Sequence, residues 1–260
     1  EFIDFNFKDF SKIKEAINNS DIVINLIGIL FENRKQKFAN MHSDLPGIIA
    51  KYCSETEVKK FIHVSAIGAN ADSNSIYQQS KFNGEQNAFN NFKNTVIIRP
   101  SVVCGVEDNF TNLFAKLSIL PVIPVVKKSY KFQPILVDDV ATAIVKAIEI
   151  KKNEGKIYEI GGPKVINFGD MVKSILNTIG KKRLVLDLPM PLAKIQAALF
   201  TLMPKPLITK DQCEILNEAD NIVSKSNLTL KDLNIKPEDV ENSMSKWLWR
   251  FRKGGEFAKI

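Results

Sequence analysis

The sequence predicts an α/β fold, in which a doubly wound parallel sheet is followed by a smaller, mainly helical lobe. The first observation is that short runs of β-forming residues alternate with segments of helical spacing through the first hundred residues. The second is that residues 21–27 are almost wholly apolar, as in strands covered on both faces. The third is that helical spacing predominates after residue 165. Alternating strands and helices form a parallel sheet with helices on both faces.

The first elements follow from local patterns. Strands are predicted at residues 2–5, 21–27, 58–64 and 95–98, and helices at residues 10–17, 38–53 and 75–92. Pro46 either kinks the second helix or lies in its first turn. Pro100 follows the fourth strand and is expected to end it. Residues 103–109 are expected to form a loop at the carboxyl edge of the sheet, where open α/β sheets bind ligands.

The later elements are shorter. Strands are predicted at residues 130–137, 156–160 and 184–188, and helices at 110–120, 138–150, 168–179 and 191–202. Residues 120–126 are predicted to be either irregular or an edge strand. Asp138 or Asp139 is expected to cap its helix. The strongly apolar helix at 191–202 suits either a core or a partner or membrane surface. We place the domain boundary between residues 164 and 165.

Composition limits the function classes. Among 260 residues, Lys and Arg number 36 and Asp and Glu 29, a net charge of +7 without a basic run long enough to predict a nucleic-acid groove. The three widely spaced cysteines predict reduced thiols, without a disulfide framework or zinc site. No metal site is predicted. No apolar run approaches the roughly 20 residues of a spanning helix, so no transmembrane segment is predicted.

Tyr77 and Lys81 are the first candidates for chemistry. They are four residues apart on the helix expected at 75–92, so that the phenol and the ammonium share one face. A neighbouring positive charge lowers the pKa of a tyrosine, which suits general acid or base work near neutral pH. Because lysine is abundant in this chain, the same spacing also arises by chance.

Five ordered motifs resemble the extended and atypical short-chain dehydrogenase/reductase superfamily, the NAD-dependent epimerase/dehydratase group. They are VINLIG at 23–28, FIHVSA at 61–66, the Tyr77/Lys81 pair, IRPSVVCG at 98–105 and VDDVATA at 137–143. More narrowly, residues 38–69, 108–110, 158–163 and 228–240 look like the family of 39 kDa nucleotide-binding accessory subunits of respiratory complex I. The resemblance implies a Rossmann-type NAD(P)-binding domain at 1–164 and a substrate or partner lobe at 165–260.

The resemblance also implies site residues. In an active enzyme, Tyr77 exchanges a proton with the substrate as hydride moves to or from the nicotinamide, Lys81 lowers the tyrosine pKa, and Ser65 is the third catalytic candidate. The implied cofactor-binding residues are Asn6 and Phe7 near the adenine, Leu26, Ile27 and Gly28 along the nicotinamide ribose, Ser65, Tyr77 and Lys81, and Pro100, Ser101 and Val102 beside the nicotinamide. The implied cofactor is NADP or NAD.

Three departures from the family pattern restrain these assignments. The catalytic serine of the epimerases falls on Ala66, and a shift of one residue points the Ser65 hydroxyl to the opposite face. Cys104 stands where many sugar-modifying members have tyrosine. No Gly-x-Gly-x-x-Gly turn occurs. We therefore expect the sheet to lack its first βαβ unit, with roughly 30 or more residues upstream in the full-length protein. Cofactor binding is expected of that protein and is doubtful for residues 1–260 alone.

Two functions remain open. The first is an NAD(P)-binding accessory or assembly subunit of respiratory NADH:ubiquinone oxidoreductase with little or no turnover, on the matrix side in mitochondria or the cytoplasmic face of a bacterial inner membrane. The alternative is a free-standing NAD(P)-dependent oxidoreductase or epimerase that uses Tyr77 and Lys81. A nucleic-acid-binding relative of the same fold is a weaker third hypothesis, and no nucleic-acid partner is expected.

Overall fold

A computed structural model describes residues 10–200, 203 and 206–255. The strand predicted at residues 2–5 and the candidate residues Asn6 and Phe7 lie outside the described residues. The chain divides into two compact units, one of residues 1–99 with 143–159 and the other of residues 100–142 with 160–260. This division differs from the predicted 1–164 and 165–260, because residues 100–142 pack with the C-terminal part of the chain.

A parallel sheet is the centre of the first unit. Its strands are β1 (Ile22–Asn25), β2 (Lys60–Val64), β3 (Thr95–Pro100) and β8 (Ile157–Ile160), in the order β1-β2-β3-β8. The pairs β1–β2 and β2–β3 are parallel, with Asn25 opposite His63 in the first pair. The amide of Ile97 donates to Lys156 O and that of Ser101 to Ile160 O, so β8 also runs parallel to β3. The predicted parallel α/β sheet is confirmed.

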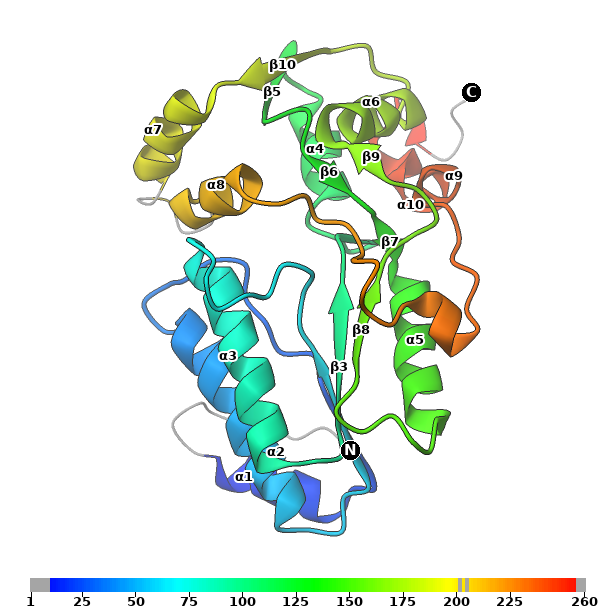
Figure 1. Cartoon of the computed structure of the whole chain (residues 1–260). Helices are drawn as coiled ribbons and strands as arrows, with labels where there is room; N and C mark the ends of the chain where they lie inside the picture. Colours follow the sequence, from blue (N-terminus) through cyan, green and yellow to red (C-terminus); the bar gives the residue numbers. More distant parts are fainter. Residues whose placement is uncertain (1–9, 201–202, 204–205, 256–260) are drawn as a thin grey trace. The chain divides into compact units, whose positions relative to one another are not determined.

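Helices cover both faces of this sheet (Figure 1). They are α1 (Ser11–Asn18), the π-helical turn η1 (Ala39–Asp44), α2 (Leu45–Ser54), α3 (Ile76–Asn91) and α5 (Val137–Glu149), whose residues from 143 onward belong to this unit. Phe61 of β2 packs in a buried cluster with Leu45 and Ile49 of α2. The adjacent Lys60 points the opposite way, and its ammonium donates to three backbone carbonyls at the C-terminal end of α5. The doubly wound arrangement is therefore confirmed.

Two predictions about proline meet different outcomes. Pro46 lies in the first turn of α2, after η1, which is one of the two expected positions. The expectation that Pro100 lies beyond the end of its strand is wrong, because β3 continues through that residue. At the position of Pro100, a backbone N–H would point toward β2, and proline has none. The pairing of β2 with β3 has already ended at Val64 and Ile98, so no acceptor of the ladder is left without its donor. Proline at this place therefore removes no ladder hydrogen bond.

The second unit combines small sheets with helices. Its strands are β4 (Val103–Cys104), β5 (Val122–Val126), β6 (Lys131–Phe132), β7 (Ile135–Leu136), β9 (Ile166–Asn167) and β10 (Leu184–Leu188), paired as β4–β7, β10–β5 and β6–β9. Its helices are α4 (Thr111–Leu117), α6 (Phe168–Thr178), α7 (Met190–Phe200), α8 (Lys210–Asn217), η2 (Leu230–Leu233), α9 (Val240–Ser243), α10 (Ser245–Leu248) and η3 (Trp249–Phe251). Four phenylalanine rings, at 110, 114, 132 and 168, pack in its core with centroids 5.3–5.7 Å apart.

Two expectations for this unit are corrected, and one of two alternatives is confirmed. The predicted loop at 103–109 begins with the short strand β4, since its backbone pairs with β7. Residues 122–126 form β5, an edge strand that pairs in parallel with β10 in a two-stranded sheet, which is one of the two structures expected at 120–126. Asp138 and Asp139 lie inside the first turn of α5 and do not precede it, and their charges there favour the helix N-terminus.

Two further features are absent from the described residues. No described helix combines the length and apolarity needed to cross a membrane. No group of three or more His, Cys, Asp or Glu within residues 10–200, 203 and 206–255 is arranged to hold a metal ion. The three cysteines are unbridged and buried.

Candidate functional site

Helix α3 places Tyr77 and Lys81 next to each other. The helix begins after Ser75, whose side chain accepts a hydrogen bond from Gln78 N and satisfies one of the free amides of the first turn. Tyr77 is therefore in the first turn, and Lys81 follows one turn later on the same face. The Lys81 ammonium lies 6.0 Å from the centroid of the Tyr77 ring. The pair expected from the sequence thus exists as two neighbouring side chains.

Lys81 is a buried cation with few internal partners. Only 5% of the residue is exposed. Within the described part of the chain, its ammonium makes one long hydrogen bond, 3.4 Å to Val64 O, and no salt bridge. Burial lowers the pKa of Lys81 to about 8, against the opposing effect of the Glu85 carboxylate. Because an ammonium has three N–H donors, Lys81 retains capacity to bind oxygen atoms of a ligand.

His42, which the sequence analysis did not select, connects the loop after β1 to α3. Its Nε2 accepts from Ile29 N at 3.0 Å, so that the proton of the neutral ring is on Nδ1. Nδ1 then donates to Ser80 Oγ at 3.1 Å, and Ser80 Oγ donates to Tyr77 O at 2.7 Å. Burial, with a further contribution from the charge of Lys81, lowers the pKa of His42 to about 3. His42 is therefore neutral at physiological pH.

The ring of His42 also packs against Tyr77. The two rings meet edge to face with centroids 5.2 Å apart. Phe38 stacks on His42 at 5.2 Å and meets the Tyr77 ring edge to face at 5.6 Å. Gly84 permits this packing, because a Cβ at that position would lie 1.8 Å from His42 O. No local spacing in the sequence relates His42 to Tyr77, since one lies in η1 and the other in α3.

Two buried polar atoms at the end of β2 have no hydrogen-bond partner among the described residues: His63 Nε2 and Ser65 Oγ. His63 Nδ1 accepts from the Asn25 amide at 3.1 Å, which places the ring proton on the unpartnered Nε2. Burial, followed by the charges of Lys81 and His42, lowers the pKa of His63 well below its usual value. Unpaired buried polar atoms are costly, so such atoms often mark a site that is completed by a ligand.

The loop after β1 lies against the same group. A Cβ at Gly28 would be 3.4 Å from Lys81 Nζ and 3.7 Å from His42 Nε2. Ile27 N donates to Asn25 Oδ1 at 3.1 Å, and Leu26 is exposed. The structure therefore brings Gly28, Tyr77 and Lys81 together, with Leu26 and Ile27 adjacent to Gly28 in the chain. Ser65 directly follows Val64, whose carbonyl Lys81 binds.

The candidates Pro100, Ser101 and Val102 belong to the second unit. Ser101 Oγ donates to Asn221 Oδ1 at 2.6 Å and accepts from Gln133 N at 3.2 Å. Val102 O accepts from Ile135 N at 3.0 Å. The Ser101 hydroxyl is thus satisfied inside its own unit, unlike the hydroxyl of Ser65.

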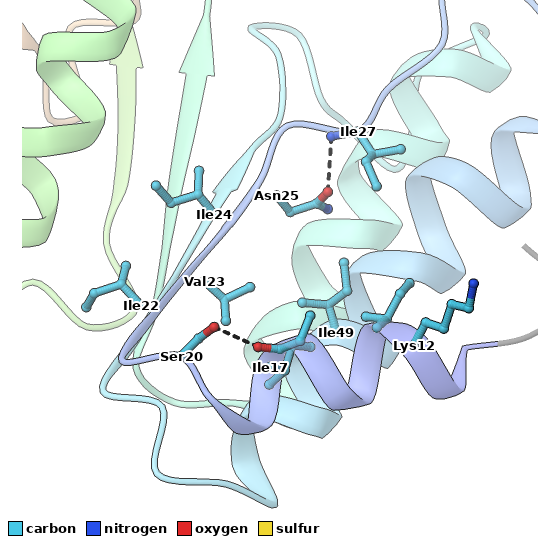
Figure 2. Close-up of a pocket in the computed structure, with 11 residues that line it drawn as sticks. Lys12, Ile17, Ser20, Ile22, Val23, Ile24, Asn25, Ile27 and Ile49 are labelled. Carbon is cyan, nitrogen blue, oxygen red and sulfur yellow. Dashed lines mark hydrogen bonds between the residues drawn. The ribbon is translucent and has the colours of Figure 1, made fainter. Parts of the chain in front are cut away.

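A separate groove of about 310 Å³ runs beside β1 in the first unit (Figure 2). Its lining is mostly apolar and comes from α1, β1, Ile27 and Ile49, with Lys12, Ser20 and Asn25 as polar members. Neither Tyr77 nor Lys81 lines it. The groove therefore lacks the chemistry of the Tyr77/Lys81 site.

The residues at the Tyr77/Lys81 site fit a dinucleotide ribose. The unsatisfied Ser65 Oγ, the His63 Nε2–H and the ammonium of Lys81 supply donors, and Gly28 has no side chain to fill the space beside Lys81. A bound nicotinamide would supply hydride transfer. Tyr77 would hold or exchange a proton at its phenol, and Lys81 would bind hydroxyls and favour the phenolate.

No protein-family model matches the chain. Solved structures show the fold. A dTDP-4-dehydrorhamnose reductase from Bacillus anthracis in complex with NADP has a TM-score of 0.68 and 15% identity, and covers 93% of this chain and 85% of its own. A UDP-glucuronic acid 4-epimerase from Bacillus cereus in complex with UDP-glucuronic acid and NAD has a TM-score of 0.60 and 20% identity, with coverage of 71% and 67%. Both resemble the Rossmann-type sheet expected from the sequence motifs.

Sequence relatives give the family. The mitochondrial NADH dehydrogenase [ubiquinone] 1 alpha subcomplex subunit 9 of Mus musculus is 33% identical over 255 residues, which are 96% of this chain and 67% of the relative. The protein of the same name from Dictyostelium discoideum is 30% identical over 260 residues, 98% and 72% of the two chains. The NADH-ubiquinone oxidoreductase 40 kDa subunit of Neurospora crassa is 27% identical over 256 residues, 98% and 68%. The chain therefore belongs to the family of NADH dehydrogenase [ubiquinone] 1 alpha subcomplex subunit 9, the 39 kDa accessory subunits of complex I.

Proposed function

We propose that this protein holds NADP(H) or NAD(H) at the Tyr77/Lys81 site and serves as an accessory subunit of a respiratory NADH:ubiquinone oxidoreductase. The observation that carries the proposal is Lys81, a buried ammonium whose one long hydrogen bond goes to the carbonyl of Val64, the residue before Ser65 with its unpartnered hydroxyl. Ribose hydroxyls supply acceptors for the first group and partners for the second. The names of the relatives supply the complex in which such a subunit would work.

The site favours retention of a nucleotide with little or no turnover. Ala66 has no hydroxyl to polarise a substrate carbonyl, and Ser65 is on the side of β2 that carries His63, because side chains alternate along an extended chain. The His42 ring cannot replace the serine as a proton donor. Its Nδ1–H already binds Ser80, and its Nε2 accepts from Ile29.

The proposal also assigns partners and a location. The protein would bind other complex I subunits at the inner membrane, on the matrix side in mitochondria or on the cytoplasmic face in a bacterium. The relatives named as mitochondrial subunits support this assignment. Co-purification of the full-length protein with a membrane complex that oxidises NADH is the expected result.

The nucleotide is tested by purifying the full-length protein without added cofactor and analysing the supernatant after denaturation by mass spectrometry. We expect one nicotinamide dinucleotide, whose 2′-phosphate distinguishes NADP from NAD. Lys81→Met should release none, because its methylene chain keeps the packing but cannot bind hydroxyls. Lys59→Met is the matched control, since Lys59 pairs with Asp21 at the exposed surface of the same unit. Equal nucleotide content in both variants would refute the assigned site.

A free-standing oxidoreductase or epimerase is the second candidate, favoured by the 6.0 Å approach of Lys81 Nζ to the Tyr77 ring. Tyr77→Phe in the full-length protein separates the two functions. If the protein only holds the nucleotide, the variant should assemble into the complex and support NADH oxidation at the wild-type rate. A loss of more than about a hundredfold in reduction of a carbonyl substrate, the usual scale of general acid catalysis, would favour the enzyme.

A further inference from the structure

The outer face of β5 and β10 is apolar where it should be polar. Figure 1 shows these strands side by side. They pair in parallel, with Leu184 opposite Val122. Alternate residues of both strands point into the core of the second unit. On the other side of these strands and in the turn before β5, five aliphatic side chains are exposed by 36–84%: Ile119, Leu120, Val122, Leu184 and Leu186. We call these five residues the β5–β10 face. Beyond it, at the C-terminal ends of the two strands, Val126 and Leu188 pack against α7 and α8. A sheet face that meets water normally carries polar residues.

Basic residues flank this face. Lys181 and Lys182 directly precede β10, and the guanidinium of Arg183 donates to Ser118 O at 2.8 Å, which holds it beside the turn that carries Ile119. Residues 109–131 contain no Asp or Glu, and Asp187 is the one acidic residue at 181–188. The Asp187 carboxylate accepts from Lys128 N at 2.9 Å. The face therefore combines aliphatic side chains with an almost purely positive border.

We propose that the β5–β10 face docks on an anionic lipid surface. Aliphatic side chains enter the boundary between headgroups and acyl chains, and lysine and arginine next to them bind lipid phosphates. A protein partner is less well matched, since protein interfaces are enriched in aromatic residues and depleted of lysine. Contiguous exposed apolar patches mark interaction sites in general. Here the positive charge of the flanking residues favours an anionic lipid surface over a protein partner.

The experiment measures co-sedimentation of the full chain with vesicles of phosphatidylcholine alone and with phosphatidylglycerol added. Binding is expected only to the anionic vesicles and should weaken as salt is raised, because the electrostatic attraction is screened. The double variant Ile119→Ser/Leu184→Ser should bind at least tenfold more weakly. Lys182→Glu should have a similar effect, because it reverses one charge at the surface.

Matched controls come from exposed positions of the first unit. Val145→Ser removes an exposed apolar side chain from α5, and Lys152→Glu reverses an exposed charge; both should leave vesicle binding unchanged. Circular dichroism and tryptophan fluorescence establish that every variant is folded. Binding to neutral and anionic vesicles alike, or no binding to either, would overturn the proposal. It would also be overturned if the β5–β10 variants kept vesicle binding but lost self-association or incorporation into a complex, since the occupant would then be protein.

Discussion

Replacing Lys81 by methionine should stabilise the fold of the first unit while it removes nucleotide binding. The pKa of Lys81 is lowered from 10.5 to about 8, chiefly by burial. The protonated side chain is therefore less favourable in the folded protein than in the unfolded chain. Methionine preserves the length and the apolar stem but carries no charge, so the unfavourable burial of an ammonium disappears with the substitution.

The magnitude follows from the shift. Each pKa unit corresponds to about 1.4 kcal/mol, so that a change from 10.5 to about 8 amounts to roughly 3 kcal/mol. Loss of the hydrogen bond to Val64 O reduces this gain in free energy of unfolding by about 1 kcal/mol. We therefore expect the variant to gain about 2 kcal/mol in free energy of unfolding at pH 7, without bound nucleotide.

The direction of the Lys81 pKa shift also determines how the free energy of unfolding depends on pH. Below pH 8 Lys81 is protonated in both states, and the unfavourable contribution is fully present. Between pH 8 and 10.5 the unfolded chain binds more protons than the folded protein, so the stability of the wild type rises with pH. The gain of the variant should shrink by about 1 kcal/mol between pH 7 and 9.

Urea unfolding of the nucleotide-free proteins, followed by far-ultraviolet circular dichroism at both pH values, measures these differences. Lys59→Met is again the control, and the pH dependence of its stability relative to the wild type should show no step between pH 7 and 9. A Lys81→Met variant that is less stable than the wild type at pH 7 would refute the reasoning, because it would mean that the ammonium has favourable partners in the folded protein.

Three further experiments test the packing inside each of the two units. Gly84→Ala should destabilise the protein by about 3 kcal/mol or more in urea unfolding, because its methyl group would overlap His42 O. Arg99→Met should cost about 3–5 kcal/mol, since it leaves the buried carboxylates of Glu85 and Glu159 without a counter-charge. Replacing both Glu85 and Glu159 by glutamine in the Arg99→Met variant should restore much of the lost free energy of unfolding. The three cysteines should react with a thiol reagent at pH 8 only after unfolding, because burial raises the pKa of each thiol.

Much of the first unit could be predicted because its patterns are local. The apolar run that became β1 and the helical spacing that became α1 report burial directly, and the alternation of strands and helices dictates a parallel sheet. The extent of β3 could not be predicted, because whether Pro100 disrupts a ladder depends on where the neighbouring strand ends. The pairing of β5 with β10 depends similarly on residues more than fifty positions away.

The candidate site, too, could be predicted from the sequence only where its contacts are local. Tyr77 and Lys81 could be paired from their spacing, since one turn of helix brings them together. The contribution of His42 could not, because it depends on the π-helical turn and on Gly84, which lets the two backbones approach. Burial of Lys81 could not be predicted either. Lysine usually lies at the surface, and nothing in residues 76–91 marks this one as enclosed.

The protonation of the two histidines also decides which ligands the site suits. A metal ion needs a ring nitrogen with a free lone pair. The lone pair of His42 Nε2 is occupied by Ile29 N–H, and that of His63 Nδ1 by the Asn25 amide. Their other nitrogens carry protons, and the Nδ1–H of His42 already donates to Ser80 Oγ, so that the Nε2–H of His63 is the donor left for a ligand. With Lys81 as a second donor and the Ser65 hydroxyl as donor or acceptor, the cluster is complementary to oxygen atoms that accept and to hydroxyls that do both. Among the parts of a dinucleotide, that description fits the ribose.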